Sequence, residues 1–226
     1  MQEQPKAEAD TGRAYADKTG NYFGGVRQDF LARLPARSDL AILEIGCGYG
    51  ETGAAAIVQG KCASYVGVEL FPKAADVART HLTEVVTGDV ERIDLPWPPD
   101  HFDALLMSEV LEHLVDPWAT VRHLVPLLKP GALVMASSPN VAQIRTIRNL
   151  LADRWELADS GLMDRTHLRW FTQSSYRQMF EQAGVTIDHV APLSPPGRWG
   201  RLFNTATWNR YSHLTMRQIC VVGHKR

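Results

Sequence analysis

The chain has 226 residues, of which 45% are hydrophobic, and this proportion predicts a compact fold with its own core rather than a disordered chain. The formal net charge of −1 gives no reason to expect a broad nucleic-acid or membrane surface, but it does not exclude a small local basic patch. The three cysteines are widely spaced, which argues against a disulfide framework and against a thiolate zinc site. With neither a long apolar run nor a signal-peptide core, the sequence predicts a cytoplasmic protein without a membrane span.

The chain divides into two predicted regions. Residues 1–20 are predicted to be a flexible N-terminus because charged and small residues dominate there. Residues 21–226 are predicted to form a single domain. Its first element is a helix from Gly25 to Leu34, which Pro35 ends.

Short apolar segments then alternate with helical ones, and this alternation predicts βαβ units and a mostly parallel sheet. The predicted strands are residues 41–45, 64–70, 83–89, 102–109, 132–139, 185–190 and 217–224. The predicted helices are residues 51–60, 72–82, 116–131 and 172–184. A polar, arginine-rich connection at about 140–170 interrupts the alternation and is predicted to be a lid-like insertion, and residues 192–204 are predicted to be a second, turn-rich loop.

A glycine-rich turn follows the first predicted strand, in the stretch ILEIGCGYGE from Ile42 to Glu51. Gly46, Gly48 and Gly50 alternate in this turn, and glycine lets a ligand contact the backbone where a side chain would block it. The N-terminus of the next helix offers unpaired N–H groups at the same place. The sequence therefore predicts a ligand site at the carboxyl end of this strand.

The charges around the turn discriminate between two classes of cofactor. Glu44 precedes the turn and Glu51 follows it, and the spacing is GxGxG rather than the GxGxxG of dinucleotide-binding turns. The two acids would repel a pyrophosphate but not a net-positive sulfonium nucleoside. Glu69, at the end of the second strand, is placed to accept both hydroxyls of a ribose. These features favour S-adenosyl-L-methionine over NAD.

Three further stretches complete a family pattern: TGD at residues 87–89, FDALLMSEVLEHL at 102–114 and LLKPGALVMASSPN at 127–140. Together with the glycine turn, they resemble the class I S-adenosylmethionine-dependent methyltransferases over about residues 20–190. The resemblance implies an α/β fold with a Rossmann-like, seven-stranded, mostly parallel sheet. It also implies helices on both faces and an antiparallel last strand.

The same resemblance implies a set of cofactor-binding residues. The glycines would line the methionine part, Glu69 would hold the ribose, Asp89 with Val90 would frame the adenine, and Ser108 with Glu109 would lie by the methyl group. The implied residues are Glu44, Gly46, Cys47, Gly48, Tyr49, Gly50, Glu69, Leu70, Asp89, Val90, Ser108 and Glu109.

The stretch SEVLEHL carries Glu109, Glu112 and His113, which would share one face of a helix that begins at Glu109. The later stretch DRTHLRWFT supplies His167. This pattern resembles the metal-dependent O-methyltransferases of ubiquinone biosynthesis and the enzymes that methylate the terminal ribose of small RNAs. The resemblance implies a divalent metal (Mg, Mn or Zn) on all four of these residues, although the ribose enzymes place two histidines in the later motif and this chain has one.

Each residue of this group also has a simpler interpretation: Glu112 as a helix-surface charge and His113 as a packed side chain. The interpretation adopted gives catalytic roles to Glu109, His113 and His167. A bound cation would activate an acceptor hydroxyl, and without a metal one of the two histidines would act as general base.

The acceptor is predicted more coarsely than the cofactor. The segment before the first strand and the segment after the fifth resemble methyltransferase domains of bacterial polysaccharide clusters, which implies a small-molecule or glycan acceptor. Five arginines in the second segment are candidates to meet an acidic group or to be solvated: Arg145, Arg148, Arg154, Arg165 and Arg169. A nucleic-acid acceptor is disfavoured by a pI of about 6.7.

The function predicted from the sequence is therefore in-line O-methylation of a hydroxyl by an S-adenosylmethionine-dependent methyltransferase. Three alternatives remain: an N-methyltransferase, a NAD-dependent oxidoreductase, and a catalytically silent cofactor-binding subunit.

Overall fold

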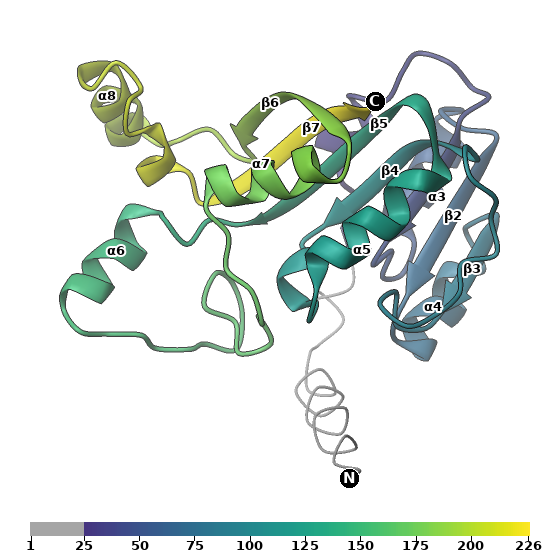
Figure 1. The fold of residues 1–226 in the computed structure, drawn as a ribbon, viewed down its shortest axis with the longest axis horizontal. Helices are drawn as coiled ribbons and strands as arrows, with labels where there is room; N and C mark the ends of the chain where they lie inside the picture. The colour runs from purple at the N-terminus through teal and green to yellow at the C-terminus, as the bar shows by residue number, and fades with distance from the viewer. Residues whose placement is uncertain (1–24) are drawn as a thin grey trace, which may run out of the picture.

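The computed structural model describes residues 25–226, so the prediction of a flexible segment at 1–20 lies outside the described residues. Within residues 25–226, seven strands form one sheet in the order β3-β2-β1-β4-β5-β7-β6 (Figure 1). Strand β7 is antiparallel to both of its neighbours and the other pairs are parallel, which confirms the predicted sheet. The strands are β1 Ala41–Ile45, β2 Ser64–Glu69, β3 Glu84–Thr87, β4 Phe102–Ser108, β5 Leu128–Pro139, β6 Val185–Pro192 and β7 Gln218–Lys225.

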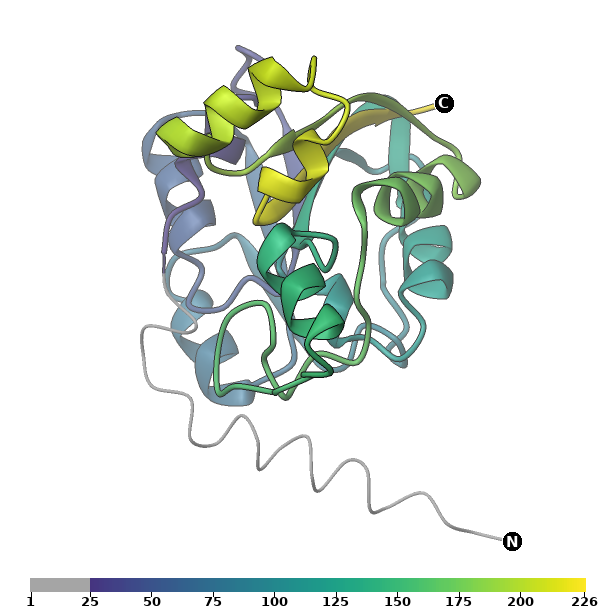
Figure 2. The same ribbon diagram turned by 90° about the vertical axis from the view of Figure 1, so that its left-hand side faces the viewer.

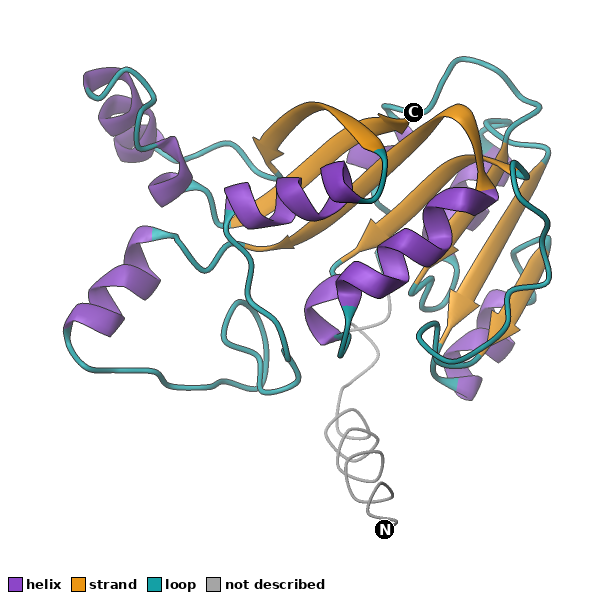
Figure 3. Cartoon of the chain, in the orientation of Figure 1, coloured by secondary structure: helices purple, strands orange, loops and turns teal. Residues whose placement is uncertain are grey.

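Helices cover both faces of the sheet, and a separate apolar cluster lies under each layer (Figure 3). One layer holds α2 Gln28–Leu31, α3 Glu51–Val58 and α4 Pro72–Ala78. The other holds α5 Pro117–Leu124 and α7 Gln173–Gln182. Two further helices, α6 Ile144–Leu151 and α8 Arg198–Ala206, lie at the left of Figure 1, away from both layers.

Side-chain caps begin the two helices of the second layer. Asp116 accepts a hydrogen bond from the N–H of Ala119 at 2.9 Å, and Thr172 and Ser175 form a capping box at the start of α7. The prediction that the first of these helices continues to residue 131 is wrong. Pro126 has no N–H to donate, so the helix ends at Leu124 and a 3₁₀ turn leads directly into β5.

The predicted helix beginning at Glu109 does not form. Glu109 has a left-handed backbone with φ +53°, and its N–H donates to Ser137 O at 3.0 Å. This bond to the end of the neighbouring strand turns the chain out of a helical path. Only a short 3₁₀ turn, η2 Leu111–His113, follows, so Glu109 does not share a helix face with Glu112 and His113.

Two other predictions need correction. The segment 192–204 is not a loop throughout, because α8 begins after Gly197, whose carbonyl accepts from Arg201 N–H at 2.9 Å. The predicted helix 25–34 shortens to α2 and a turn, because Arg33 N–H donates to Phe30 O at 3.0 Å in a tighter, i to i+3 pattern. Leu34 is still buried by this turn.

Candidate active site

The glycine turn lies between β1 and α3, where the sheet order places the carboxyl ends of β3, β2, β1 and β4 side by side. Gly46, Gly48 and Gly50 have φ values of +70°, +56° and +78°, a region in which other residues are strained. A Cβ at Gly46 would lie 2.5 Å from Val110 Cγ2. The turn is therefore restricted to glycine by backbone conformation and, at Gly46, by space.

Glu69 fixes the shape of this turn from the end of β2. Its Oε2 accepts a hydrogen bond from Gly48 N–H at 2.8 Å, and its Oε1 accepts from Phe71 N–H at 3.0 Å. The side chain is buried, and burial raises its pKa while the backbone donors lower it. A carboxylate held next to the turn is chemically suited to accept hydrogen bonds from ribose hydroxyls.

Glu44 and Cys47, both predicted to bind cofactor, have side chains in the core. Glu44 Oε2 accepts from Tyr65 OH at 2.8 Å, and burial raises the pKa of Glu44 to about 7. Cys47 Sγ lies where Gly67 leaves space, because a Cβ at Gly67 would be 2.5 Å from it. Burial also raises the pKa of the Cys47 thiol, so it stays protonated and packs as an apolar group.

The raised pKa of Glu44 predicts how stability depends on pH. Between pH 4.5 and about 7 the folded chain keeps a proton that the unfolded chain has released, so the free energy of unfolding falls as pH rises through this window. Glu44→Gln keeps an oxygen that accepts from Tyr65 and should exceed the wild type in stability by on the order of 3 kcal/mol above pH 7. Thermal unfolding of both proteins from about pH 5 to about pH 8 measures this difference, and a difference that does not change with pH would contradict the assignment.

The remaining predicted cofactor residues lie along the same edge of the sheet. Asp89 follows β3, where its Oδ1 accepts from Glu91 N–H at 3.0 Å and its Oδ2 pairs with Arg92 Nε at 3.3 Å. Val90 beside it is buried, whereas Leu70, next to Glu69, is half exposed. Tyr49 is partly exposed in the glycine turn, and Ser108 ends β4. The structure thus brings these residues to one edge.

Arg27 also lies at this edge of the sheet, and it was not among the residues predicted from the sequence. Its guanidinium donates to Ser108 Oγ and, at 2.9 Å, to Ser137 Oγ, at the ends of β4 and β5. Asp29 forms a bidentate pair with it, with both distances 2.9 Å. The segment before α2 reaches this place because Arg27 N–H donates to Thr52 Oγ1 at 3.2 Å, in the first turn of α3. A single arginine before a short helix carries no sequence signal for these contacts.

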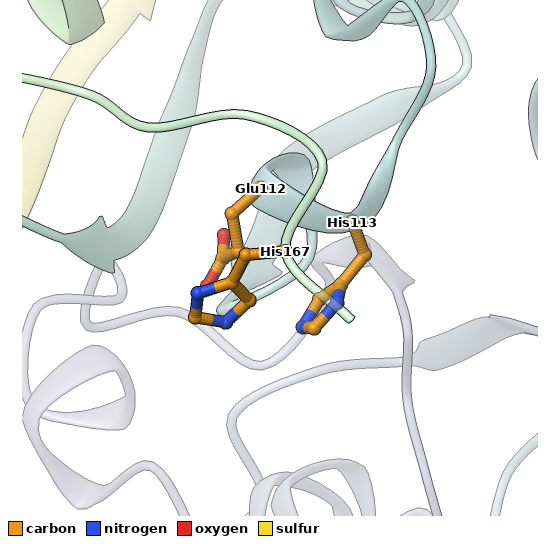
Figure 4. A group of neighbouring side chains, drawn as sticks. All are labelled: Glu112, His113 and His167. Atoms are coloured by element: carbon orange, nitrogen blue, oxygen red, sulfur yellow. The ribbon is translucent and has the colours of Figure 1, made fainter. Parts of the chain in front are cut away.

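A second group of side chains gathers beyond the end of β4. Glu112, His113 and His167 each offer one ligand atom, and these atoms lie within 4.8 Å of one another (Figure 4). The two imidazole rings are 4.7 Å apart between centroids. Three of the four residues predicted as metal ligands are therefore neighbours, although His167 is far from the others in sequence.

The backbone of Glu112 explains how His167 reaches this position. Glu112 O accepts from the N–H groups of Leu168 and Arg169, at 2.8 and 2.9 Å. Asp164 shapes the preceding turn, since its Oδ1 accepts from both the N–H and the hydroxyl of Thr166, at 2.9 and 2.8 Å. The segment 140–170, predicted to be a lid, is thus tied directly to the turn that carries Glu112.

Backbone carbonyls orient both imidazole rings. His113 Nδ1 lies 3.2 Å from Thr166 O, and His167 Nδ1 lies 3.0 Å from Leu162 O. A carbonyl only accepts, so each ring, in its neutral form, carries its proton on Nδ1 and its lone pair on Nε2. This is the arrangement that histidine metal ligands show, with the other ring nitrogen donating to a backbone carbonyl.

Glu109 is not a member of this three-residue group. Its Oε2 accepts from Gln218 Nε2 at 3.0 Å, on β7. Its other oxygen, Oε1, belongs to a set of buried side-chain atoms that have no hydrogen-bond partner among the described residues. The other members are both carboxylate oxygens of Glu112, Ser138 Oγ, Trp170 Nε1 and Tyr176 OH. Burial, and then the charge of Glu109, raise the pKa of Glu112 well above its usual range.

A buried carboxylate without a partner is costly, and a cation is one group that would relieve the cost. The donor set of one carboxylate and two imidazoles fits a divalent transition metal or zinc. Glu112, His113 and His167 therefore have donor atoms of the types that such a metal binds, and these atoms lie close together.

Comparison with known proteins identifies the family. A model for a family described as a methyltransferase domain matches residues 20–190, which is more than half of the chain. This chain is a class I S-adenosylmethionine-dependent methyltransferase. That finding excludes the NAD-dependent alternative.

Two curated relatives and one solved structure describe the likeness of this methyltransferase to other proteins. A ubiquinone biosynthesis O-methyltransferase of Cereibacter sphaeroides is 30% identical over 188 residues, which cover 80% of this chain and 71% of the relative. A ubiquinone biosynthesis O-methyltransferase of Xylella fastidiosa is 35% identical over 120 residues, which cover 51% of this chain and 48% of the relative. This second match therefore spans only about half of either protein. A methyltransferase structure from Archaeoglobus fulgidus has a TM-score of 0.66 at 18% identity, covers 91% of this chain and 97% of its own, and supports the fold.

The methyltransferase site fits its cofactor on structural grounds. S-adenosylmethionine carries a ribose, an adenine amino group and a carboxylate, and the edge of the sheet offers Glu69, Asp89 and Arg27. At Gly46 the glycine turn admits no side chain, because a Cβ there would collide with Val110. No helix in residues 25–226 is both long and apolar enough to cross a bilayer.

Proposed function

We propose that this methyltransferase transfers the methyl group to a hydroxyl that is activated by a divalent metal ion on Glu112, His113 and His167. The observation that carries the proposal is the buried, unpartnered carboxylate of Glu112 beside two imidazoles whose Nδ1 atoms are engaged by backbone carbonyls. The likeness to relatives named ubiquinone biosynthesis O-methyltransferases supports a hydroxyl acceptor. A small molecule or a glycan is the acceptor class we propose.

The chemistry divides between two groups of residues. When bound, the cofactor supplies a methyl group on a sulfonium, and a divalent metal lowers the pKa of the acceptor hydroxyl. Glu69 and the glycine turn hold the nucleoside so that its methyl group lies near the end of β4. Glu112, His113 and His167 would hold the metal beside the acceptor hydroxyl, and the segment 140–170 would exclude water above it.

Glu109 is not one of the metal ligands in this proposal. It lies between Ser108 and Glu112 in the sequence, and its charge is the largest contribution after burial to the raised pKa of Glu112. One of its oxygens is bonded to Gln218, so we assign Glu109 to the wall of the acceptor pocket rather than to the metal.

Arg27 is proposed to bind the carboxylate of the methionine part. Arg27→Gln should weaken binding of S-adenosylhomocysteine about 10- to 100-fold, since a hydrogen bond to a charged group contributes about 1.5–3 kcal/mol. Methylthioadenosine has the same nucleoside without the carboxylate, so its affinity should be unchanged. Calorimetric titration of both ligands separates this role from a general loss of structure, which would weaken both equally.

The proposal is tested with matched pairs of acceptors. Phenol- and sugar-type hydroxyl acceptors, and amine analogues of the same shape, are incubated with S-adenosylmethionine and metal, and the products are identified by mass spectrometry. Methylation of the hydroxyl acceptors that is lost with a chelator supports the proposal. Chelator-resistant methylation of the amines would favour the N-methyltransferase alternative, and cofactor binding without methylation of any acceptor would favour a silent subunit.

A further inference from the structure

Helices α6 and α8 form an exposed amphipathic surface, and its outward-facing side chains have no role in the proposed methyl transfer. Both helices lie at the same end of the molecule, at the left of Figure 1 and toward the viewer in Figure 2. Asn140 joins the segments that carry them, because its Nδ2 donates to His213 O and Met216 O at 2.8 Å. The amphipathic surface is defined here as the exposed side chains of residues 144–151 and 198–211.

Helix α6 exposes the apolar side that a surface helix normally buries. Its buried residue is the polar Thr146, whereas Leu151 is 84% exposed and Leu150 and Ile144 are about half exposed. Ile144 and Leu151 lie two turns apart on one side of the helix, and Arg145 is on the other side. An apolar stripe of this kind is normally packed against a core. Here it faces outward.

Helix α8 repeats the same arrangement. It packs on the 3₁₀ turn Ser212–Thr215 through Gly200, where a Cβ would lie 3.5 Å from Thr215 Cβ, and through Asn204, whose Nδ2 donates to Thr215 Oγ1 at 3.0 Å. The opposite side of the helix carries Trp199 and Leu202, which are 71% and 59% exposed. A small residue and an amide thus face inward while the large apolar side chains face out.

The charge of this surface is of one sign. Residues 144–151 and 198–211 contain no aspartate or glutamate, and they contain five arginines, all exposed: Arg145, Arg148, Arg198, Arg201 and Arg210. Trp208, 90% exposed, and Tyr211 add aromatic side chains to the same segment. The near-neutral charge of the whole chain therefore conceals a local cationic and apolar surface.

We propose that this amphipathic surface docks on an anionic lipid bilayer. Helices with arginine on the polar face and Trp, Phe and Leu on the other lie in the plane of a bilayer interface, and the arginines attract acidic headgroups. A second copy of the chain is a poorer occupant, since it would oppose arginine to arginine. Nucleic acid would pair with the arginines but would leave the leucines and Ile144 in water.

The experiment is sedimentation of the full-length protein with vesicles. Vesicles of phosphatidylcholine alone are compared with vesicles that also contain phosphatidylglycerol, at low and high salt. The surface predicts binding to the anionic vesicles that weakens as salt is raised, and little binding to phosphatidylcholine alone. Equal binding to both kinds of vesicle, or binding to neither, would overturn the proposal.

Variants with matched controls locate the contact. Trp199→Glu and Leu151→Glu should each reduce vesicle binding at least about tenfold, whereas Val58→Glu, at a position 87% exposed on α3, should not. Arg201→Gln should reduce binding about fivefold, and Arg177→Gln on α7 should leave it unchanged. Light scattering provides the remaining check: a wild-type dimer that Trp199→Glu converts to a monomer would assign the surface to a second copy and contradict a lipid partner.

Discussion

Glu69→Ala is expected to reduce the affinity for S-adenosylhomocysteine about 100-fold or more. The variant loses the acceptor for two ribose hydroxyls, and each hydrogen bond to a charged group contributes about 1.5–3 kcal/mol. It also leaves the N–H groups of Gly48 and Phe71 without their acceptor, which loosens the glycine turn. Calorimetric titration of the folded variant measures the change in affinity.

Two companion variants separate the role of Glu69 from a general effect of removing charge. Glu69→Gln keeps one oxygen acceptor and should bind with an affinity between those of the wild type and the alanine variant. Glu84→Ala removes an exposed carboxylate at the amino end of β3, the other end of the sheet, and should bind as the wild type does. Binding by Glu69→Ala within about twofold of the wild type would show that this carboxylate does not hold the ribose.

Adding metal should raise the melting temperature of the wild type, and a chelator should reverse the increase. A metal at about 100 times its dissociation constant contributes about 2.7 kcal/mol, or roughly 5–10 °C for a chain of this size. His167→Ala should lose this response because it removes one of three ligand atoms. His81→Ala, at an exposed position after α4, should keep it.

Glu112→Gln should change stability in opposite directions with and without metal. Without metal the variant should be more stable than the wild type, because it removes a buried carboxylate whose oxygens have no hydrogen-bond partner among residues 25–226. Added metal should raise the free energy of unfolding of this variant less than that of the wild type, because the charged ligand is lost. A variant that is destabilised in the metal-free state and still responds fully to metal would place Glu112 outside any metal site.

The sequence predicted the sheet and the cofactor edge because both depend on local signals. Apolar strands, a GxGxG turn and acids at strand ends are each readable within a few residues, and the sheet order then brings them to one edge. His167 was also identified as a partner of Glu112, but only by a family resemblance. The contact itself depends on the bonds from Leu168 and Arg169 to Glu112 O, which no spacing reveals.

Two of the errors come from tertiary hydrogen bonds, and a third comes from local composition. Glu109 was assigned to a helix because the spacing to Glu112 and His113 suits one, but its N–H pairs with Ser137 O instead. Arg27 was overlooked because its partners, Ser108 and Ser137, come from distant strand ends. The helix α8 was taken for a loop because Pro195, Pro196 and Gly197 directly precede it, Gly200 lies within it, and its apolar side faces outward.

The most direct test of the proposed chemistry is a crystal structure of the complex with S-adenosylhomocysteine and zinc, with data collected at the metal absorption edge. The account predicts one anomalous peak bounded by Glu112 and the Nε2 atoms of His113 and His167, with metal–nitrogen distances of about 2.0–2.1 Å. It also predicts that the sulfur of the cofactor product faces that peak from the glycine turn. Cofactor in the glycine turn with no metal at these three residues would contradict metal-assisted methyl transfer.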